Sequence, residues 1–517
     1  MSRAVFLSLS IPAILIIVDI IRKKRRALPP GPSSYPLIGQ LLSAPASFAH
    51  VEYRKLSREL KSDIISFEFL GNTIIVLNSA ESTNDLLDKR SAIYSSRTST
   101  PMIEHEQLLN WKDSVPLAPY GDGFRAHRRV FNTWLNKNAS SPMLQYDGVE
   151  ITSRVLKDQF DLLAAASVMK ATYGYQVSSP QDSYVTNIKK VEENLTKCCL
   201  PTRKLFQFGI NGSSHMKRGL YSHLEFMVNI LPFLVHVPNW VPGTGWKNIA
   251  KEWRRLKDQV LEDTFQWTKL RMDEGVAEPS IIQSYLEDLA SRGEKLSEEN
   301  ASIIKNVGVS LFAGGTTTIA TSLEVFILAM LLFPNVQRKA QEEIDYVIGL
   351  DRLPEMNDLK SLPYLGNLVQ EVLRWQIVFP LGIPHTCTED NVYRGYLIPK
   401  GAVVIGNAWA ISRDETLYDQ PEKFNPDRFN DPSVPPAPAF GWGRRKCAGF
   451  HYAESLLSIS IASILATFNI TMAKDNEGHY LVPSVADTPG FEHQPLPFTC
   501  IMTSRSAYRR RLIADDS

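Results

Sequence analysis

The chain lacks the sequence features that mark several large classes of protein. Its 517 residues include only five cysteines, and no two of them form a CxxC pair, so neither a disulfide framework nor a zinc site is indicated. Lys and Arg total 56 against 55 for Asp and Glu, and this balance does not favour nucleic-acid binding, which needs a basic excess. No internal repeat, low-complexity tract or Gly-rich dinucleotide fingerprint occurs. We therefore expect reduced cysteines in a globular body that faces the cytosol.

Hydrophobic residues make up 44% of the chain and charged residues 21%, proportions typical of a globular protein with a sizeable core. Residues 64–70 and 73–77 read as a β-hairpin rich in Ile, Val and Phe, and residues 393–397 and 402–405 read as a second hairpin. Between the two hairpins nearly every segment favours helix. The expected fold class is mainly α with a small β part.

The N-terminus carries an apolar run, residues 4–21, followed at once by the basic residues 22–26. The run is at the short limit for a bilayer span, and a basic cluster after a single span holds that side in the cytosol. A cleaved signal peptide is the alternative, but it would carry its charge before the run and small residues after it. We expect a transmembrane anchor with its basic stop over 1–26, a Pro-rich hinge over 27–45 and one large domain over 46–517.

The clearest helix is expected from Ser297 to about Leu332. Ser297 can cap it, and the two glutamates that follow suit the positive end of the helix dipole. Its length of roughly 35 residues, or ~50 Å, would cross a whole domain. Pro334 then suits the first turn of another helix, which is expected to end near Gly349.

The middle of the long helix contains the run AGGTTT, residues 313–318. Two glycines cost about 1 kcal/mol each in a helix interior, and consecutive threonines are also poor helix formers. One interpretation is a packing notch where another helix crosses. The other is a bulge that leaves room for a small molecule, with a hydroxyl at hand. Local reasoning does not decide between them.

Residues 440–449, FGWGRRKCAG, precede an apolar helical stretch over 452–465. Cys447 therefore lies just before a helix start, where outward-pointing N–H groups stabilise an anion and lower the pKa of a thiol. The glycines permit a tight backbone path, and Arg445 supplies a cation for a carboxylate. The alternative is a buried structural cysteine, the usual fate of a free thiol.

Five residues match every fixed position of the haem signature Phe-x-x-Gly-x-Arg-x-Cys-x-Gly, namely Phe440, Gly443, Arg445, Cys447 and Gly449. The chain thereby resembles the cytochrome P450 family, over about residues 28–505, and in style the fungal enzymes of secondary metabolism. The resemblance implies the cytochrome P450 fold, a single large haem-binding domain, with Cys447 as the thiolate ligand to the iron of haem b and the other four residues binding the cofactor.

Further residues match family positions. Glu371 and Arg374 resemble the family's Glu-x-x-Arg pair, one helical turn apart, and Arg428 falls in a Pro-x-Arg-Phe segment. Alone, such a pair is usually a solvated surface contact. The resemblance implies that the three form a structural network that holds the haem loop.

Arg128 and His385 match positions that, with Arg445, reach the haem propionates. Phe124 stands where the family usually has a Trp, so one hydrogen bond to a propionate is in question. His385 could instead be a core histidine with a partner of its own.

The run at 313–318 resembles the family's Ala/Gly-Gly-x-Asp/Glu-Thr motif, which favours the bulge. The resemblance implies an oxygen site formed by Gly314, Thr316 and Thr317, in which Thr317 contacts dioxygen and helps to deliver protons. Thr316 replaces the usual acid, and a hydroxyl relays protons without being a source of them. Proton delivery is therefore expected to differ from the family's pattern.

The implied function is a monooxygenase that inserts one oxygen atom from dioxygen into a lipophilic terpenoid, polyketide or aromatic intermediate. Electrons would come from NADPH through a membrane-bound NADPH–cytochrome reductase, at the endoplasmic reticulum membrane, with a single-pass anchor and the catalytic domain facing the cytosol. Two alternatives are a reductase-independent haem-thiolate isomerase or dehydratase and a non-catalytic haem-binding protein. By analogy, residues 95–110 and 202–246 cover the pocket. The aromatics of the second segment could contact the bilayer, line an access channel or lie in the core.

Overall fold

Runs of apolar residues after Asp63 form the first two strands of a four-stranded sheet. β1 (Ile64–Phe69) and β2 (Asn72–Leu77) pair as an antiparallel hairpin, which confirms the first predicted hairpin. The turn between them contains Gly71 at φ +86°, a conformation that favours glycine.

The strand β7 (Val403–Gly406) joins two distant parts of the chain. It pairs in parallel with β2 and antiparallel with β4 (His385–Thr386), so the sheet order is β1-β2-β7-β4. The second predicted hairpin is therefore wrong in its partners. A two-residue turn with both φ angles positive makes β6 (Tyr396–Ile398) pair with β5 (Asn391–Tyr393) instead. Alternation identifies a strand but carries no information on which strand it pairs with.

The computed structural model describes residues 27–35, 39–40, 45, 48–69, 71–98, 100–134, 149–199, 227–229, 231–509 and 511. The anchor expected over 1–26 lies outside these residues, as does part of the hinge expected over 27–45. Those segments, and the domain boundaries they set, stay predictions.

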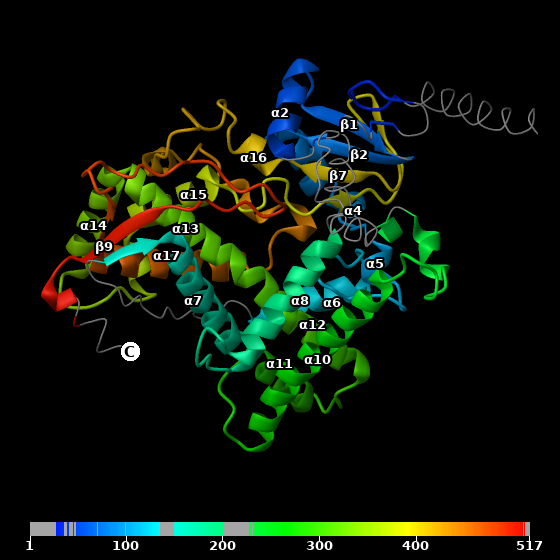
Figure 1. Ribbon diagram of the computed structural model, residues 1–517, viewed down its shortest axis with the longest axis horizontal. Coiled ribbons are helices and arrows are strands. Elements are labelled where there is room, and N and C mark those ends of the chain that lie inside the picture. The colour runs from blue at the N-terminus through cyan, green and yellow to red at the C-terminus, as the bar shows by residue number, and fades with distance from the viewer. Residues whose placement is uncertain are drawn as a thin grey trace, which may run out of the picture.

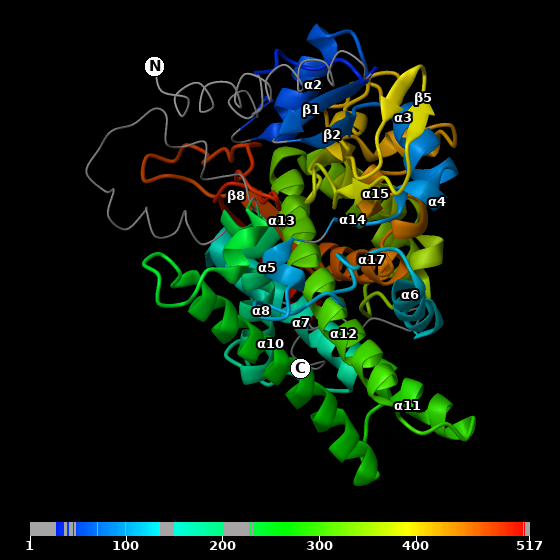
Figure 2. The same ribbon diagram turned by 90° about the vertical axis from the view of Figure 1, so that its right-hand side faces the viewer.

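The described chain is mostly helical with a small β part, which confirms the predicted fold class (Figures 1 and 2). The longer helices are α2 (Ala49–Glu59), α6 (Asp122–Trp134), α7 (Ser153–Tyr173), α8 (Ser183–Cys199), α10 (Trp246–Asp273), α11 (Ile281–Ser291), α12 (Glu298–Gly315), α13 (Thr317–Leu332), α14 (Pro334–Ile348), α15 (Pro363–Trp375) and α17 (Phe450–Thr467). The short helical segments are α3 (Ala80–Thr83), η1 (Asn84–Lys89), α4 (Ser91–Tyr94), α5 (Pro101–Glu104), η3 (Met227–Asn229), η4 (Pro232–His236), η5 (Asp358–Ser361), α16 (Ala408–Ile411), η6 (Pro426–Asn430), η7 (Pro438–Phe440) and η8 (Gly443–Arg445).

The four-stranded sheet lies far from the helices α10 and α11. In Figure 1 the four-stranded sheet lies with α2 and α16 at one end, and α10 and α11 lie at the opposite end. A second sheet has the order β3-β9-β8, formed by β3 (Val149–Thr152), β9 (Thr499–Ser504) and β8 (Phe468–Met472). It ties the C-terminal part of the chain to the start of α7.

The helix expected from Ser297 is present but divided. The Ser297 side chain accepts a hydrogen bond from the Asn300 amide at 3.1 Å, and α12 and α13 meet at Thr316, the one residue between them. The two run end to end through the helical part (Figure 2). The next helix, α14, begins at Pro334 and ends at Gly349, as predicted.

The core centres on α13, in which every residue from Ile319 to Leu331 is buried. It packs against α7, α15 and α17. By length and composition alone, the stretch 298–332 is the one described helix that could cross a membrane, but 78% of its apolar window is buried inside the protein. Its apolar character therefore matches its place in the core.

The two glycines of the AGGTTT run have different surroundings. A Cβ on Gly315 would lie 2.9 Å from Cγ2 of Val168 on α7, whereas a Cβ on Gly314 would meet nothing within 4 Å. The helix is irregular at Thr316, where φ is −92° and ψ is −72°. Both interpretations thus hold for neighbouring residues, because Gly315 is the packing notch and Gly314 borders open space beside the break.

This difference predicts opposite effects of two neighbouring substitutions on stability. Gly315→Ala should lower the free energy of unfolding by about 1 kcal/mol, since its methyl group overpacks against Val168. Gly314→Ala should raise it by up to about 1 kcal/mol through helix propensity. Chemical denaturation of the two variants beside the parent protein measures both, and equal shifts would contradict the assignment of the notch.

Candidate active site

The backbone around Cys447 is a tight loop closed by a hydrogen bond. The Cys447 amide donates to the Phe440 carbonyl at 2.8 Å, and the ring of Phe440 packs edge-on against Phe450, the first residue of α17. The Gly449 amide donates to the Cys447 sulfur. The sulfur therefore lies at the N-terminal end of α17, as the sequence predicts.

Gly443 is required by its contact with η1. Its φ is +56°, and a Cβ there would lie 2.1 Å from the Leu87 carbonyl oxygen. Its amide donates to the Asp88 carboxylate at 2.5 Å. The absence of a side chain at Gly443 thus lets the loop pack against the N-terminal part of the chain.

The electrostatic setting of Cys447 differs from the expectation. The side chain is exposed to solvent, yet protein atoms crowd its other sides, and this desolvation raises the pKa of the thiol. The Gly449 amide, Arg128 and Lys446 act in the opposite direction but do not outweigh it. The amide at the helix start thus lowers the pKa as predicted, but desolvation makes the net shift upward, opposite to the predicted direction. A bound metal ion would deprotonate the thiol outright.

Three guanidinium groups and one imidazole gather near the loop. Arg97, Arg445 and His385 are buried and Arg128 is partly buried. Arg445 donates to the carbonyls of Ser95 and Ala118, both at 2.6 Å. None of the three arginines forms an ion pair within the part of the chain that the structure describes.

Two of these arginines have lowered pKa values and no negative partner among the described residues. Burial and Arg128 lower the pKa of Arg445 to about 9, and burial together with Arg445 lowers that of Arg97 well below its ordinary value. Nη1 of Arg445 and Nε of Arg97 are buried without a hydrogen-bond partner. Buried charges in proteins are normally paired, so this cluster fits an anionic group with several oxygen atoms.

Arg97 was not identified from the sequence. Its Nη1 donates to the carbonyls of Ile383 and Pro384, at 2.5 and 2.6 Å, so its position depends on a segment far along the chain. No local motif surrounds Arg97. The predicted residues Arg128, His385 and Arg445 do lie in the same cluster.

His385 and Phe124 have distinct roles there. Nδ1 of His385 lies 2.7 Å from the Tyr94 carbonyl, to which it donates. Burial, followed by Arg97, lowers the pKa of His385 to about 3, so its Nε2 can donate to a carboxylate only after gaining a proton. Phe124 lies under Arg445, whose guanidinium carbon is 3.6 Å from the ring centroid. The ring orients Arg445 by a cation–π contact.

The three threonines beside the helix break use their hydroxyls differently. Thr316 is fully buried and donates to the Phe312 carbonyl at 2.9 Å, and Thr318 donates to the Gly314 carbonyl at 2.8 Å. The Thr317 hydroxyl instead faces the Glu192 carboxylate of α8 at 3.5 Å. Of the three, only Thr317 reaches another element.

Comparison with known proteins agrees with these motifs. The family model for cytochrome P450 matches residues 29–486. A cytochrome P450 monooxygenase of Armillaria gallica is 35% identical over 95% of this chain and 94% of its own length. The chain belongs to the cytochrome P450 family. Cytochrome P450 monooxygenase 98 of Postia placenta is 36% identical over 97% of this chain and 95% of its own length, and a relative from Aspergillus oryzae is 32% identical over 95% and 92%.

The P450 family carries a haem held by a cysteine thiolate, and the residues around Cys447 fit one. The accessible sulfur would supply the ligand, the cation cluster would supply partners for two propionates, and the space beside Gly314 would leave room on α12. The sulfur comes from the loop before α17 and the open space from α12. The cation cluster comes from the loop after α4 and from α6, β4 and η8.

The P450 Glu-x-x-Arg pair is fully buried and bonded to a third residue. Glu371 accepts from Arg374 at 2.7 and 2.9 Å and from Arg428 at 3.2 Å. Arg374 also donates to the carbonyls of Ser412 and Pro421, both at 2.8 Å. One carboxylate therefore holds two guanidinium groups and joins α15 to the segment before the haem loop.

Gln370 is a positioning residue that motif reasoning missed. Its amide donates to Glu454 on α17 at 2.7 Å, and its carbonyl accepts from the Ala437 amide at 3.2 Å. Gln370 thus ties the buried network to both ends of the haem loop, a role that its long-range partners alone reveal.

The aromatics expected to cover the pocket divide between surface and core. Trp240 and Phe233 are 82% and 62% exposed, whereas Trp246 is 6% exposed. Phe206, Phe208 and Phe226 lie outside the described residues.

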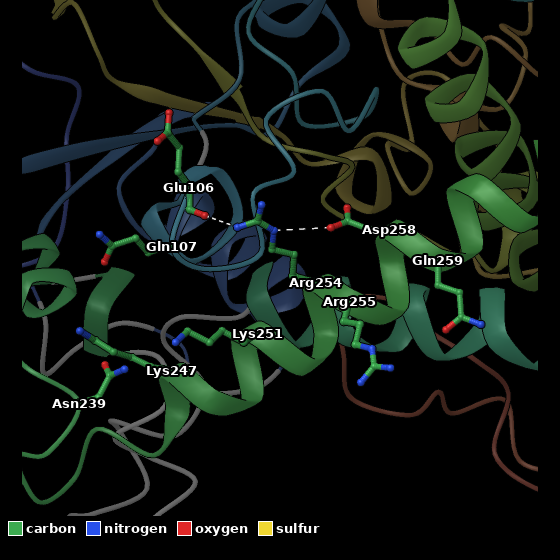
Figure 3. Close-up of a pocket in the computed structure, with 9 residues that line it drawn as sticks. All are labelled: Glu106, Gln107, Asn239, Lys247, Lys251, Arg254, Arg255, Asp258 and Gln259. Carbon is green, nitrogen blue, oxygen red and sulfur yellow. Dashed lines mark hydrogen bonds and ion pairs between the residues drawn. The ribbon is translucent and has the colours of Figure 1, made fainter. Parts of the chain in front are cut away.

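An open hollow of about 820 Å³ lies elsewhere, along the first half of α10 (Figure 3). It contains no predicted site residue. Arg254 is held between the Glu106 carbonyl and Asp258, and Lys247 donates to the carbonyls of Val235 and Val237. Two of its cations therefore have structural partners.

Removal of the shared carboxylate tests the buried network. Glu371→Ala should lower the free energy of unfolding by about 3–5 kcal/mol, because it leaves Arg374 and Arg428 buried and unpaired. Glu342→Ala is the matched control, since its pair with Arg338 is exposed and should contribute under about 0.5 kcal/mol. Chemical denaturation measures both, and similar losses would show that burial adds nothing.

Substitution of Arg97 tests the cation cluster. Arg97→Gln should speed haem transfer to an excess of apomyoglobin about ten- to a hundredfold, the effect of losing one charge-assisted hydrogen bond of about 1.5–3 kcal/mol. The exposed Arg129→Gln on α6 is the control and should not change the rate. Equal rates for both variants would remove Arg97 from the cofactor site.

Proposed function

We propose that this chain is a haem-thiolate monooxygenase with Cys447 as the ligand to the iron of haem b. One observation carries the proposal. An accessible sulfur at the start of α17 lies near buried guanidinium groups that have no carboxylate partner in the described chain. When bound, the haem activates dioxygen, and its thiolate ligand favours cleavage of the O–O bond.

The protein's own residues would hold and orient the reactants. Arg97, Arg128 and Arg445 would pair with the propionates, and His385 would join them once protonated. Phe440, Gly443 and Gly449 shape the loop that presents the sulfur. On the facing helix, Gly314 would leave space for dioxygen and substrate.

Thr317 would hold a proton at its hydroxyl beside the oxygen site. Thr316 has a different part, because its buried hydroxyl already donates to its own helix. Its contribution would be to the helix break that turns Thr317 toward its neighbours.

The relatives support a class of substrate, and the N-terminal sequence supports a membrane-bound electron donor. The relatives are fungal cytochrome P450 monooxygenases, which supports oxidation of a lipophilic secondary-metabolite intermediate of terpenoid, polyketide or aromatic type. Electrons would come from NADPH through a membrane-bound reductase. The apolar run at 4–21 and the basic residues after it support a single-pass anchor in the endoplasmic reticulum membrane, with the catalytic domain in the cytosol.

The carbon monoxide difference spectrum of the reduced protein tests the ligand. Cys447→Ala should lose the thiolate spectrum and all turnover, because no other sulfur replaces the ligand. Cys387→Ala is the matched control and should keep both, since Cys387 is buried in a separate apolar cluster with Tyr94. A normal spectrum in the Cys447 variant would refute the proposal.

A further inference from the structure

The break in the long helix leaves one hydroxyl facing a carboxylate from another helix. Oγ1 of Thr317 lies 3.5 Å from Oε1 of Glu192 on α8. This separation is longer than the usual O–H···O distance of about 2.7–2.8 Å. Hydrogen bonds used in catalysis are often long before the reactants bind and shorten in the loaded site. The pair joins the oxygen side of the proposed site to an acid on α8.

Glu192 lies among groups that favour its protonated form. Burial, then Glu492 and Asp161, raise the pKa of Glu192 well above its ordinary value, while Lys189 and Thr317 lower it. Lys189 donates to Asp161 at 3.2 Å, so the nearest cation is already paired. Glu192 itself forms no ion pair among the described side chains. This setting disfavours the ionised form of the carboxyl group.

The charged groups around Glu192 come from every element packed on that side. On α7 they are Lys157 and Asp161, which form an ion pair at 3.1 Å. On α13, burial raises the pKa of Glu324 to about 7, and in the C-terminal loop burial raises that of Glu492. In their ionised forms, Glu492 and Asp161 place negative charge beside Glu192, which strengthens its hold on the proton as pH rises.

The sequence departure at Thr316 makes this acid relevant. The family's usual acid next to the threonine is absent, and the Thr316 hydroxyl is buried and committed to Phe312. A relay that begins at Thr317 needs a donor from elsewhere, because a hydroxyl passes on a proton only when it receives one.

We propose that Glu192 is the acid that supplies protons to Thr317, in place of the acid missing at position 316; this proposal rests on the proposed monooxygenase function. The Thr317 hydroxyl passes its proton to the oxygen being reduced and takes one from the Glu192 carboxyl group. Glu192 is left as a carboxylate and regains its proton from water. Each transfer moves one proton, with no change in any other bond of the two residues.

Two measurements on the same variants test the role. Glu192→Gln keeps the size and the hydrogen-bonding capacity of the side chain but removes the acid. Glu193→Gln, the adjacent exposed residue on α8, is the matched control. The first measurement is the infrared difference spectrum across a pH titration of the substrate-free protein, which detects a protonated carboxyl group. The second is product formed and hydrogen peroxide released per NADPH consumed with reductase and an accepted lipophilic substrate.

The proposal predicts that Glu192→Gln removes one component of the protonated carboxyl absorption at neutral pH, beside any from Glu324 and Glu492, and that Glu193→Gln retains it. It also predicts that Glu192→Gln lowers product per NADPH at least about tenfold, since a positioned acid contributes on the order of a hundredfold or more, and releases peroxide instead. Thr317→Ala, with haem retained, should show the same diversion.

Unchanged coupling in Glu192→Gln, or protonated carboxyl absorption equal to that of the parent protein, would overturn the inference. These failures are distinct from failure of the proposed function, because they require a protein with the normal carbon monoxide difference spectrum. A chain that lacks that spectrum before any substitution would refute the function itself.

Discussion

Buried positive charge without a protein carboxylate is the constraint on which the site depends. Arg97 and Arg445 are held by backbone carbonyls, and each has a buried nitrogen with no partner. Such an arrangement is unfavourable for the protein by itself. It would become favourable when an anionic group enters, and the propionates of a haem whose iron is bound by Cys447 would satisfy it. The cofactor would thereby contribute to the stability of the fold as well as to the chemistry.

The haem loop can keep its geometry because separate parts of the chain hold it. Gly443 fits against η1 where no side chain would fit, and Gln370 bonds to both ends of the loop. Behind these contacts, Glu371 neutralises part of the charge of two arginines in a fully buried network. These contacts fix the position of the thiol in advance, so less conformational entropy would be lost when the sulfur binds iron.

Much of the site could be predicted because its motifs are local. The spacing around Cys447 and the turn between Glu371 and Arg374 appear in the sequence as they appear in the fold. Arg97 and Glu192 could not be found in this way, since their partners lie on distant segments. The same reason explains the wrong partner assigned to β7, as its neighbours β2 and β4 are remote in sequence. The direction of the pKa shift of Cys447 was also predicted wrongly, because desolvation depends on packing that a motif does not describe.

X-ray absorption at the iron edge of the purified parent protein tests the central claim most directly. The account predicts one iron per chain, with a single sulfur neighbour among nitrogen ligands. Iron surrounded only by nitrogen and oxygen, or a chain that holds no iron when haem is supplied during expression, would contradict it.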